Sequence, residues 1–214
     1  MRVIAIPVKS LARAKSRLAP VLSPLERAAL TLAMLEDVLD AALSVPGWET
    51  WVVSPDESVL EIAGRRRARP VAEARPPLSA AVRQVEQMAE ANRDSALAVL
   101  LGDLPLVSAR ELTAALQAGG PVVAAPSTDG DGTNLLLRRP PRAMPARFGK
   151  DSFRKHLEGA AARGLPVAVV DTPGLVFDLD APRDLERLLA AAKPGRTMQT
   201  CRELDVAGRL AVRT

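Results

Sequence analysis

Short apolar runs alternate with segments of helical periodicity along most of the chain. Residues 2–8 (RVIAIPV) and 96–101 (ALAVLL) are apolar almost throughout, which is typical of strands covered on both faces of a parallel sheet. Between residues 30 and 43, Leu, Met and Val recur at helical spacing. They follow Ser23-Pro24-Leu25-Glu26, a sequence that can form a capping box. The pattern predicts a helix that begins at Pro24 and packs one face on the core.

The same pattern assigns the remaining elements. Further strands are predicted at 50–54, 69–72, 121–125, 134–138 and 166–170, and further helices at 57–63, 78–92, 108–118, 151–163 and 182–193. Strands that alternate with helices predict an α/β fold with a mostly parallel sheet and helices on both faces. We expect one domain over residues 1–193, followed by a tail, 194–214, whose role its sequence does not indicate.

Composition narrows the class of protein. With 214 residues, of which 48% are hydrophobic, the chain can bury the core of one α/β domain. A single cysteine, Cys201, and a single histidine, His156, argue against a disulfide, a cysteine zinc site and a Ser-His-Asp triad. No apolar run approaches the roughly 18–20 residues of a membrane span, and the N-terminus is typical of a strand rather than a signal peptide. We therefore expect a cytoplasmic enzyme that contacts no membrane.

The net charge of +4 raises the question of an anionic partner. Aromatic residues make up only 2% of the chain and tyrosine is absent, so the stacking platforms that bind single-stranded nucleic acid are scarce. We expect no nucleic-acid partner. The charge suits an anionic small molecule, with general surface basicity as the alternative.

A basic loop follows the first predicted strand and carries Lys9, Lys15 and Arg17. Ligands collect at the carboxyl ends of strands in such sheets, and a polyphosphate needs both the point charge of lysine and the fork of arginine. The loop lacks the glycines of a Walker A motif and of a dinucleotide fingerprint. Taken alone, the loop is more typical of a solvated surface segment.

Three aspartates also follow predicted strands. Asp103 comes directly after the most apolar strand, and Asp178 and Asp180 are two residues apart. In an extended segment such a pair points the same way, so both carboxylates could reach one cation. Magnesium binds a few carboxylates together with phosphate oxygens, and we expect the three aspartates to converge on it. The alternatives are a turn role for Asp103 and a helix cap for Asp180.

Two further segments can receive an anion. Residues 128–134 (TDGDGTN) are rich in glycine, which permits close backbone approach to a ligand. Residues 148–153 (FGKDSF) open a predicted helix, and a helix N-terminus is a ready site for an anion. For each segment alone, an ordinary turn or helix cap is the alternative.

Taken together, these segments resemble the phospholactate/phosphoenolpyruvate guanylyltransferase family of coenzyme F420 biosynthesis. The resemblance covers most of residues 1–190 and rests on the order and spacing of five motifs: PVK at 7–9 with AKSRL at 14–18, GDLP at 102–105, GDGTN at 130–134, FG at 148–149 with Ser152, and DLDAP at 178–182. It implies a Rossmann-like GT-A nucleotidyltransferase fold, GTP as the donor and Mg²⁺ as the cofactor.

The resemblance also implies roles for individual residues. They are phosphate neutralisation and nucleotide binding by Lys9, Lys15 and Arg17, further nucleotide contact by Ser79, Mg²⁺ binding by Asp103, Asp178 and Asp180, and acceptor binding by Thr133, Gly149 and Ser152. Ser79 stands where the family often has an amide side chain. The loop at 130–133 carries an additional carboxylate, Asp131, compared with the family pattern.

The implied reaction is attack by the acceptor's phosphate on the α-phosphorus of GTP, with release of pyrophosphate. Phosphoenolpyruvate is favoured as the acceptor, because the alanine- and arginine-rich composition is typical of GC-rich bacteria; 2-phospho-L-lactate and 3-phosphoglycerate stay open. One alternative is a nucleotidyltransferase of the sugar-nucleotide or molybdopterin type, whose glycine-rich opening is absent here. Another is a non-catalytic nucleotide- or RNA-binding module, which would need no aspartate trio. Whether the chain forms a homodimer stays open.

Overall fold

One sheet organises the part of the chain that the computed structural model describes, residues 1–75 and 77–212. Its strand order is β3-β2-β1-β4-β6-β5-β7. β6 runs antiparallel to both β4 and β5, and the other neighbours are parallel, so the predicted mostly parallel sheet is confirmed. The strands are β1 (Arg2–Pro7), β2 (Glu49–Ser54), β3 (Arg69–Ala72), β4 (Ala96–Leu100), β5 (Val122–Pro126), β6 (Thr133–Arg138) and β7 (Val167–Val169).

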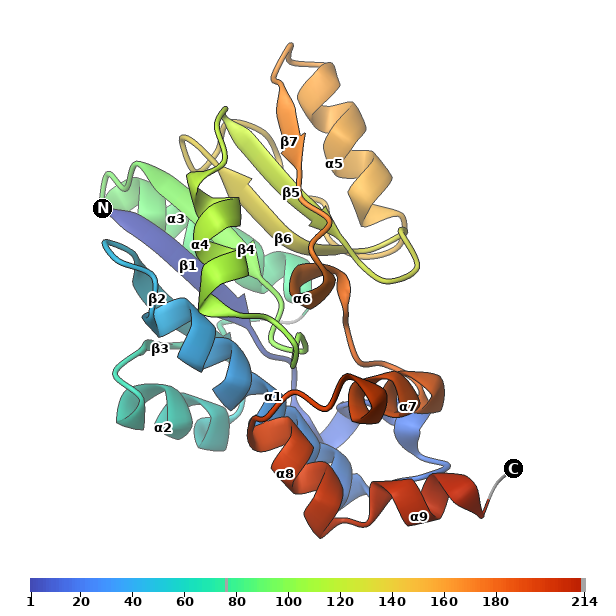
Figure 1. Cartoon of the computed structure of the whole chain (residues 1–214). Helices are drawn as coiled ribbons and strands as arrows, with labels where there is room; N and C mark the ends of the chain where they lie inside the picture. The colour runs from blue at the N-terminus through green and yellow to red at the C-terminus, as the bar shows by residue number, and fades with distance from the viewer. Residues whose placement is uncertain (76, 213–214) are drawn as a thin grey trace.

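Helices cover both faces of this sheet (Figure 1). α1, α2 and α4 share a core with one face, and α3 and α5 pack on the other. None of the described helices has the length and apolar character needed to cross a bilayer. The helices are α1 (Pro24–Leu43), α2 (Glu57–Arg65), α3 (Leu78–Ala91), α4 (Ala109–Gln117), α5 (Ser152–Ala161), α6 (Pro173–Val176), α7 (Pro182–Ala191), α8 (Arg196–Glu203) and α9 (Val206–Ala211).

Local sequence accounts for how the main elements begin and what they bury. The Ser23 hydroxyl accepts a hydrogen bond from the Glu26 amide at 3.4 Å, and the Glu26 carboxylate accepts one from the Ser23 amide at 2.8 Å. This is the expected capping box, and it places Pro24 at the first turn of α1. All five residues of β4 are buried, as its continuous apolar run predicts.

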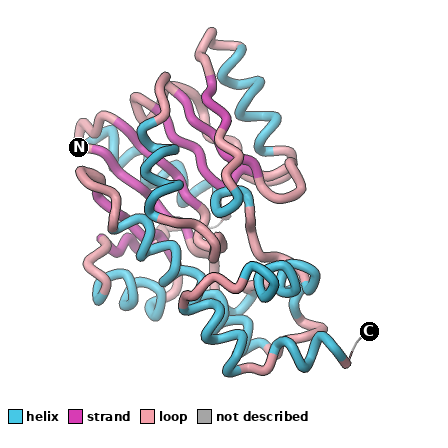
Figure 2. The backbone as a smooth tube through the Cα atoms, in the orientation of Figure 1, coloured by secondary structure: helices cyan, strands magenta, loops and turns pink. Residues whose placement is uncertain are grey.

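The C-terminal segment, for which the sequence predicts no element, forms α8 and α9 against α1. Asp37 of α1 accepts hydrogen bonds from the amides of Arg196 (2.7 Å) and Thr197 (2.9 Å) at the start of α8. Cys201 and other apolar residues of these helices share a core cluster with Leu18 of the basic loop. Figure 2 shows α7, α8 and α9 grouped on one side of the sheet, next to this loop. The C-terminal helices therefore support the segment that carries the lysines.

Candidate active site

Lys15 lies at the centre of the polar residues at the carboxyl ends of β1 and β4. Its ammonium donates to Asp103 Oδ2 at 2.6 Å and to Asp180 Oδ1 at 2.7 Å. Only 8% of the Lys15 side chain is exposed. Two of the aspartates expected to bind a metal are thus joined through one lysine, although they are 88 and 165 residues away from it in sequence.

The backbone around Lys15 is unusual. Its φ of 48° and ψ of 44° put a residue with a full side chain in the left-handed region, which costs on the order of 1 kcal/mol. Two short 3₁₀ turns, Leu11–Arg13 and Ser16–Leu18, flank it. Leu18 is fully buried, and Arg27 Nε donates to the Ala14 carbonyl at 3.2 Å. The loop is therefore held in place from both sides of Lys15.

The electrostatics agree with this arrangement. Burial by itself would lower the pKa of Lys15, but the carboxylates of Asp103 and Asp180 outweigh it and raise the pKa above its ordinary value. Burial would raise the pKa of Asp180, but the charge and hydrogen bond of Lys15, with smaller contributions from Arg17 and Lys9, lower it. Lys15 and Asp180 therefore each favour the charged form of the other.

Asp178 completes the acidic group from the other side. Its Oδ1 accepts a hydrogen bond from the Thr128 amide at 2.8 Å. Burial is the largest cause of its raised pKa, and the nearby charges of Asp103 and Asp180 add to the effect. Asn134 donates to the carbonyls of Leu175 (3.0 Å) and Val176 (2.9 Å) and so ties the chain leading to Asp178 onto β6.

One carboxylate oxygen of the acidic group is unpaired among the described residues. Asp103 Oδ1 is buried and has no hydrogen-bond partner among the described residues. Within residues 1–75 and 77–212, no group of three or more His, Cys, Asp or Glu side chains is placed to hold a metal ion. The Lys15 ammonium stands between Asp103 and Asp180 instead.

Asp184, not Asp180, caps α7. Asp184 Oδ2 accepts hydrogen bonds from the amides of Asp180 (3.0 Å) and Ala181 (2.8 Å). Placing this carboxylate in the first turn also suits the helix dipole. The Asp180 side chain is consequently available to Lys15.

The other predicted nucleotide residues are more peripheral. Arg17 Nη1 lies 3.8 Å from Asp180 Oδ2, and 75% of its side chain is exposed. Lys9 is exposed as well, yet it is close enough to lower the pKa of Asp180. Ser79 is half-buried in the first turn of α3, and no hydrogen bond in the described part of the chain joins it to this cluster. Lys9 and Arg17 can reach a ligand without breaking a buried contact.

The predicted acceptor residues Thr133 and Ser152 meet in a second, neutral group. Ser152 Oγ donates to Thr133 Oγ1 at 3.2 Å, and both residues are buried. Gly149 is exposed, with a φ of 121°, and its carbonyl accepts a hydrogen bond from the Ser152 amide at 3.1 Å. This positive φ explains why glycine stands at position 149.

His156 belongs to the same group, although sequence reasoning gave it no role. Its Nδ1 lies 2.9 Å from Thr133 Oγ1, and its Nε2 accepts a hydrogen bond from the Arg147 amide at 2.8 Å. The signal was present in the sequence: His156 comes four residues after Ser152 on one helix, and residues at that spacing share a helix face.

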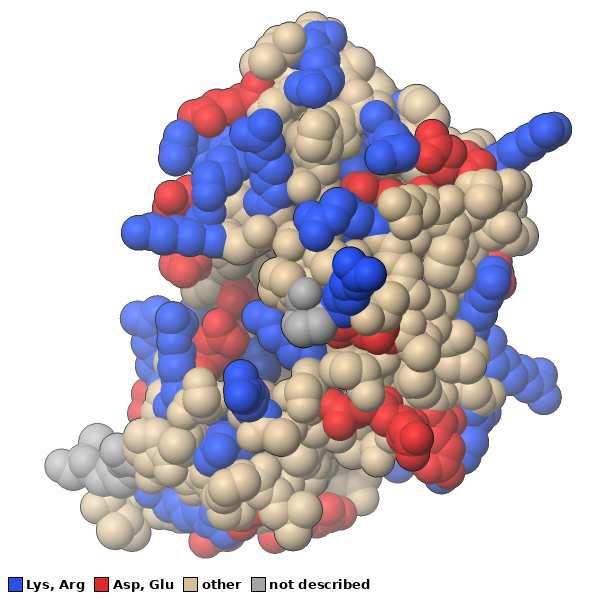
Figure 3. All heavy atoms as spheres, turned by 180° about the vertical axis from the view of Figure 1, so that it is seen from behind, with Lys and Arg blue, Asp and Glu red and all other residues tan. Residues whose placement is uncertain are grey.

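The loop between β5 and β6 touches both groups. At one end the Thr128 amide binds Asp178, and further along the Asp131 carbonyl accepts a hydrogen bond from the Phe153 amide at 3.1 Å. The loop is therefore hydrogen-bonded both to the acidic group and to the first turn of α5, which carries Ser152. In the view of Figure 3, acidic and basic side chains lie together where this face of the molecule is hollowed.

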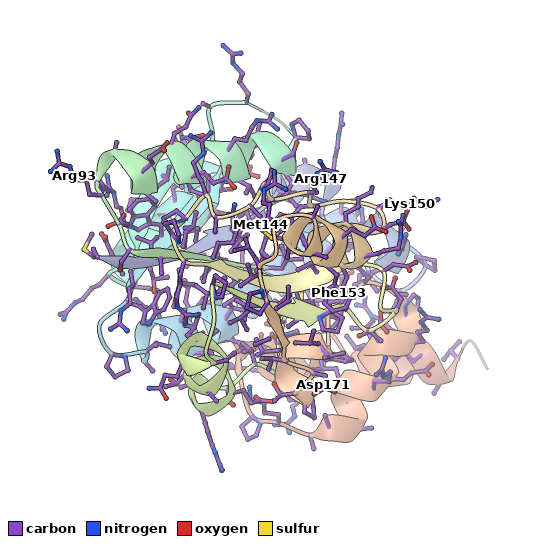
Figure 4. All side chains as sticks on the ribbon, turned by 90° about the horizontal axis from the view of Figure 1, so that it is seen from above. Arg93, Met144, Arg147, Lys150, Phe153 and Asp171 are labelled. Atoms are coloured by element: carbon purple, nitrogen blue, oxygen red, sulfur yellow. The ribbon has the colours of Figure 1, made fainter. Side chains whose placement is uncertain are left out.

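Two other hollows lie beside this site. One, of about 440 Å³, separates α3 from α5, and Figure 4 shows Arg147 on the side of α5 that faces α3. The other, of about 280 Å³, lies near α6 and α7. Neither is lined by the three aspartates or Lys15. The first is lined by Arg83, Glu86, Arg142, Met144, Pro145, Ala146, Arg147 and Arg163, and the second by Leu106, Asp171, Pro173, Val176, Phe177 and Arg187.

Comparison with known proteins places this arrangement in context. The family described as "Guanylyl transferase CofC like" matches residues 1–209. A phosphoenolpyruvate guanylyltransferase of Rubrobacter xylanophilus is 42% identical over 189 residues, covering 87% of this chain and 92% of the relative. A 3-phospho-D-glycerate guanylyltransferase of Phenylobacterium zucineum is 38% identical over 199 residues, covering 89% and 91%.

Solved structures show the same fold. A proposed nucleotide-diphospho-sugar transferase from Desulfovibrio desulfuricans G20 superposes with a TM-score of 0.82 over 99% of this chain and 98% of its own, at 19% identity. A nucleotidyl transferase from Methanothermobacter gives a TM-score of 0.64 over 89% and 97%, also at 19% identity. The Rossmann-like nucleotidyltransferase fold expected from the sequence is thus confirmed.

Proposed function

The chain belongs to the guanylyl transferase CofC-like family, and we propose that it transfers GMP from GTP to the phosphate of a small phosphorylated carboxylic acid in coenzyme F420 biosynthesis. The observation that carries this proposal is the buried Lys15, held between Asp103 and Asp180, together with the separate Thr133–Ser152 hydroxyl pair. The charges of the Lys15 cluster suit a triphosphate. The Thr133–Ser152 hydroxyls suit the anionic groups of a small acid. Both substrates are metabolites of the cytoplasm, where we expect the enzyme to act.

In the proposed reaction an oxygen of the acceptor's phosphate forms a bond to the α-phosphorus of GTP. The bond from that phosphorus to the bridging oxygen of the β-phosphate breaks, and pyrophosphate leaves with the electron pair. The attacking phosphate is already ionised near pH 7, so no general base is needed. Lys15 supplies a fixed positive charge, and Lys9 and Arg17 add charge from the rim, where it can neutralise the leaving pyrophosphate.

A divalent cation, which we take to be Mg²⁺, fits the acidic group. Asp103 has an unpartnered buried oxygen, and Asp178 has a pKa raised by burial and then by its acidic neighbours. We propose that Asp103, Asp178 and Asp180 hold the cation and that phosphate oxygens supply its remaining ligands. When bound, it would polarise the phosphoryl oxygens and stabilise the charge of the transition state.

The acceptor would lie on the neutral side of the cleft, bound by Thr133, Gly149 and Ser152. Phosphoenolpyruvate is the acid we favour, because relatives from Rubrobacter xylanophilus and Sphaerobacter thermophilus, at 42% and 39% identity, carry that name. The 3-phospho-D-glycerate enzyme is 38% identical, so overall identity separates the two acids only weakly. Ser79, in the first turn of α3, is our candidate for an additional contact with the nucleotide.

Pyrophosphate release from GTP and Mg²⁺ tests the proposal with phosphoenolpyruvate, 2-phospho-L-lactate and 3-phosphoglycerate supplied separately. We expect release with phosphoenolpyruvate and a product in which GMP is joined to the acid's phosphate, detected by mass spectrometry. Reactions without acid, and with ATP or CTP in place of GTP, are the controls. Failure of all three acids would refute the proposed function, and faster release with another acid would reassign the acceptor.

A further inference from the structure

The imidazole of His156 is buried next to the Thr133 hydroxyl, with only 1% of the residue exposed. Its two ring nitrogens have different partners. Nε2 faces the Arg147 amide at 2.8 Å, and Nδ1 faces the Thr133 hydroxyl at 2.9 Å. The ring also makes an edge contact with Phe148, at 5.1 Å between centroids. Every direction in which the ring could turn is thus occupied by the protein.

These partners determine which nitrogen carries the proton. A backbone amide can only donate, so Nε2 must accept and is unprotonated. In the neutral ring the proton therefore sits on Nδ1, which donates to Thr133 Oγ1. Burial, followed by the positive charges of Arg138 on β6 and Arg147 before α5, lowers the pKa of His156 to about 4. The ring is therefore neutral near pH 7, with the proton on Nδ1.

This tautomer limits what the two hydroxyls can do. Thr133 Oγ1 accepts from His156, and the Thr133–Ser152 hydrogen bond uses the proton of one hydroxyl or the other. In either direction, one hydroxyl proton of the pair is left over, and the pair has no further hydrogen-bond partner among the described residues. Such a proton is available to an anion.

We propose that His156 is a positioning residue that holds the Thr133–Ser152 pair as a hydrogen-bond donor to an anionic group of the acceptor acid. This role rests on the proposed function, because it assigns Thr133 and Ser152 to the acid. His156 itself does not touch the substrate. It acts by filling an acceptor site on Thr133, so that the pair presents a proton rather than a lone pair to the incoming negative charge.

The tautomer can be tested on the intact wild-type protein, because the chain has a single histidine and its imidazole signals need no assignment. We expect two-bond ¹H–¹⁵N spectra to show the Nδ1–H tautomer and no titration from pH 8 to pH 5. Addition of phosphoenolpyruvate with GTP and Mg²⁺ should shift the Nδ1 resonance more than that of Nε2. An Nε2–H tautomer, titration near pH 6.5, or an unchanged Nδ1 resonance would each overturn the proposal.

A double-mutant cycle then separates positioning from general packing. We expect Thr133→Val and His156→Leu each to raise the KM for the acid about tenfold, which is the scale of one lost hydrogen bond to a charged group. If His156 acts through Thr133, the double variant should resemble Thr133→Val alone. His156→Asn, whose amide can still donate near the Nδ1 position, should recover part of the loss. The KM for GTP should stay within about twofold throughout.

Met144→Ala is the matched control, since Met144 is buried in the hydrophobic cluster of α5 and is not a hydrogen-bond partner of the Thr133–Ser152 pair. It should lower the melting temperature without raising the KM for the acid. Additive effects in the cycle, or an equal rise in both KM values, would make His156 a purely structural residue. That result is distinct from failure of the proposed function, in which wild-type protein releases no pyrophosphate with any of the three acids.

Discussion

The candidate site has two sides that differ in charge: the Lys15–Asp103–Asp180 cluster is ionic, and the Thr133–Ser152 pair is neutral. On one side, Lys15, Asp103 and Asp180 form a partly buried cluster of ion pairs, in which the pKa of Lys15 is raised and that of Asp180 is lowered. On the other side, Thr133 and Ser152 form a buried group that rests on an imidazole kept neutral. A triphosphate and its cation change the charge of a site greatly, whereas a small acid must be recognised by directed hydrogen bonds. The charged side is therefore suited to the triphosphate and its cation, and the neutral side to the acid.

Of the substitutions considered, removal of the Lys15 ammonium should lower turnover the most. Lys15→Met keeps the apolar stem but leaves Asp103 and Asp180 facing each other without the ammonium. We expect turnover to fall by about 100-fold or more, equivalent to roughly 2–4 kcal/mol of transition-state stabilisation, and the melting temperature to fall as well.

The control for Lys15→Met is Lys9→Met, at an exposed position on the same side. Its melting temperature should be unchanged and its loss of turnover smaller. Mg²⁺ should raise the melting temperature of Lys15→Met more than that of the wild type, because a cation can replace the missing charge. A Lys15→Met enzyme with normal turnover would contradict the role of Lys15 in the charged cluster.

On the neutral side, the buried His156 should make the free energy of unfolding depend on pH. His156 has a pKa of about 4 when folded and 6.5 when unfolded. Between these values only the unfolded chain takes up the proton, so stability is lost as the pH falls from 6.5 towards 4. The shift in the pKa of His156 corresponds to about 3 kcal/mol of unfolding free energy. Urea unfolding at several pH values should show this decline in the wild type and a smaller decline in His156→Gln. Parallel curves would contradict it.

Thr133→Val tests whether the neutral side binds the acid and not GTP. The variant keeps the shape of the side chain and removes its hydroxyl. We expect the KM for the acid to rise by about 10-fold, in line with roughly 1.5 kcal/mol for a hydrogen bond to a charged group, while the KM for GTP stays nearly constant. Steady-state kinetics with each substrate varied in turn provide the measurement. A selective rise in the KM for GTP would exchange the two assignments.

The smallest effect concerns the support of the basic loop by α9. Arg209 contacts Glu26 at 2.7 Å and the Val21 carbonyl at 3.2 Å, and the hydrogen bond from Arg209 is the largest cause of the Glu26 pKa of about 2. Glu26 has a depressed pKa, so its stabilising effect is present above pH 4.5 and is lost as the pH falls towards 2. Arg209→Gln should lower the free energy of unfolding only slightly at pH 7, as the loss of an exposed ion pair does.

Unfolding of Arg209→Gln and wild type should become indistinguishable as the pH falls towards 2, where Glu26 is protonated in both. A difference that persists there would show that Arg209 acts through Val21 and not through the carboxylate. Turnover of the variant at pH 7 should remain close to that of the wild type, in contrast to Lys15→Met.

The sequence by itself determined the local elements and the residue types at the site. Apolar runs such as 96–101 and the capping box at Ser23 act over a few residues, so the strands and helices up to residue 193 follow from local preferences, except the one-turn α6, which the pattern did not predict. The motifs also indicated which lysines, aspartates and hydroxyls to consider together. The arrangement of Lys15 was not visible, because the loop at 9–19 has the composition of a solvated segment, yet its lysine is buried.

Only the tertiary structure decided how distant segments meet. It inserts β6 antiparallel between β4 and β5, joins Lys15 to Asp103 and Asp180, and packs the 196–211 segment as two short helices on α1. It also turns the single histidine towards Thr133. Such contacts depend on packing between elements far apart in the chain, and short polar helices such as α8 are stabilised by that packing rather than by their own propensity. For this reason the sequence indicated the components of the site, and the fold alone determined their partners.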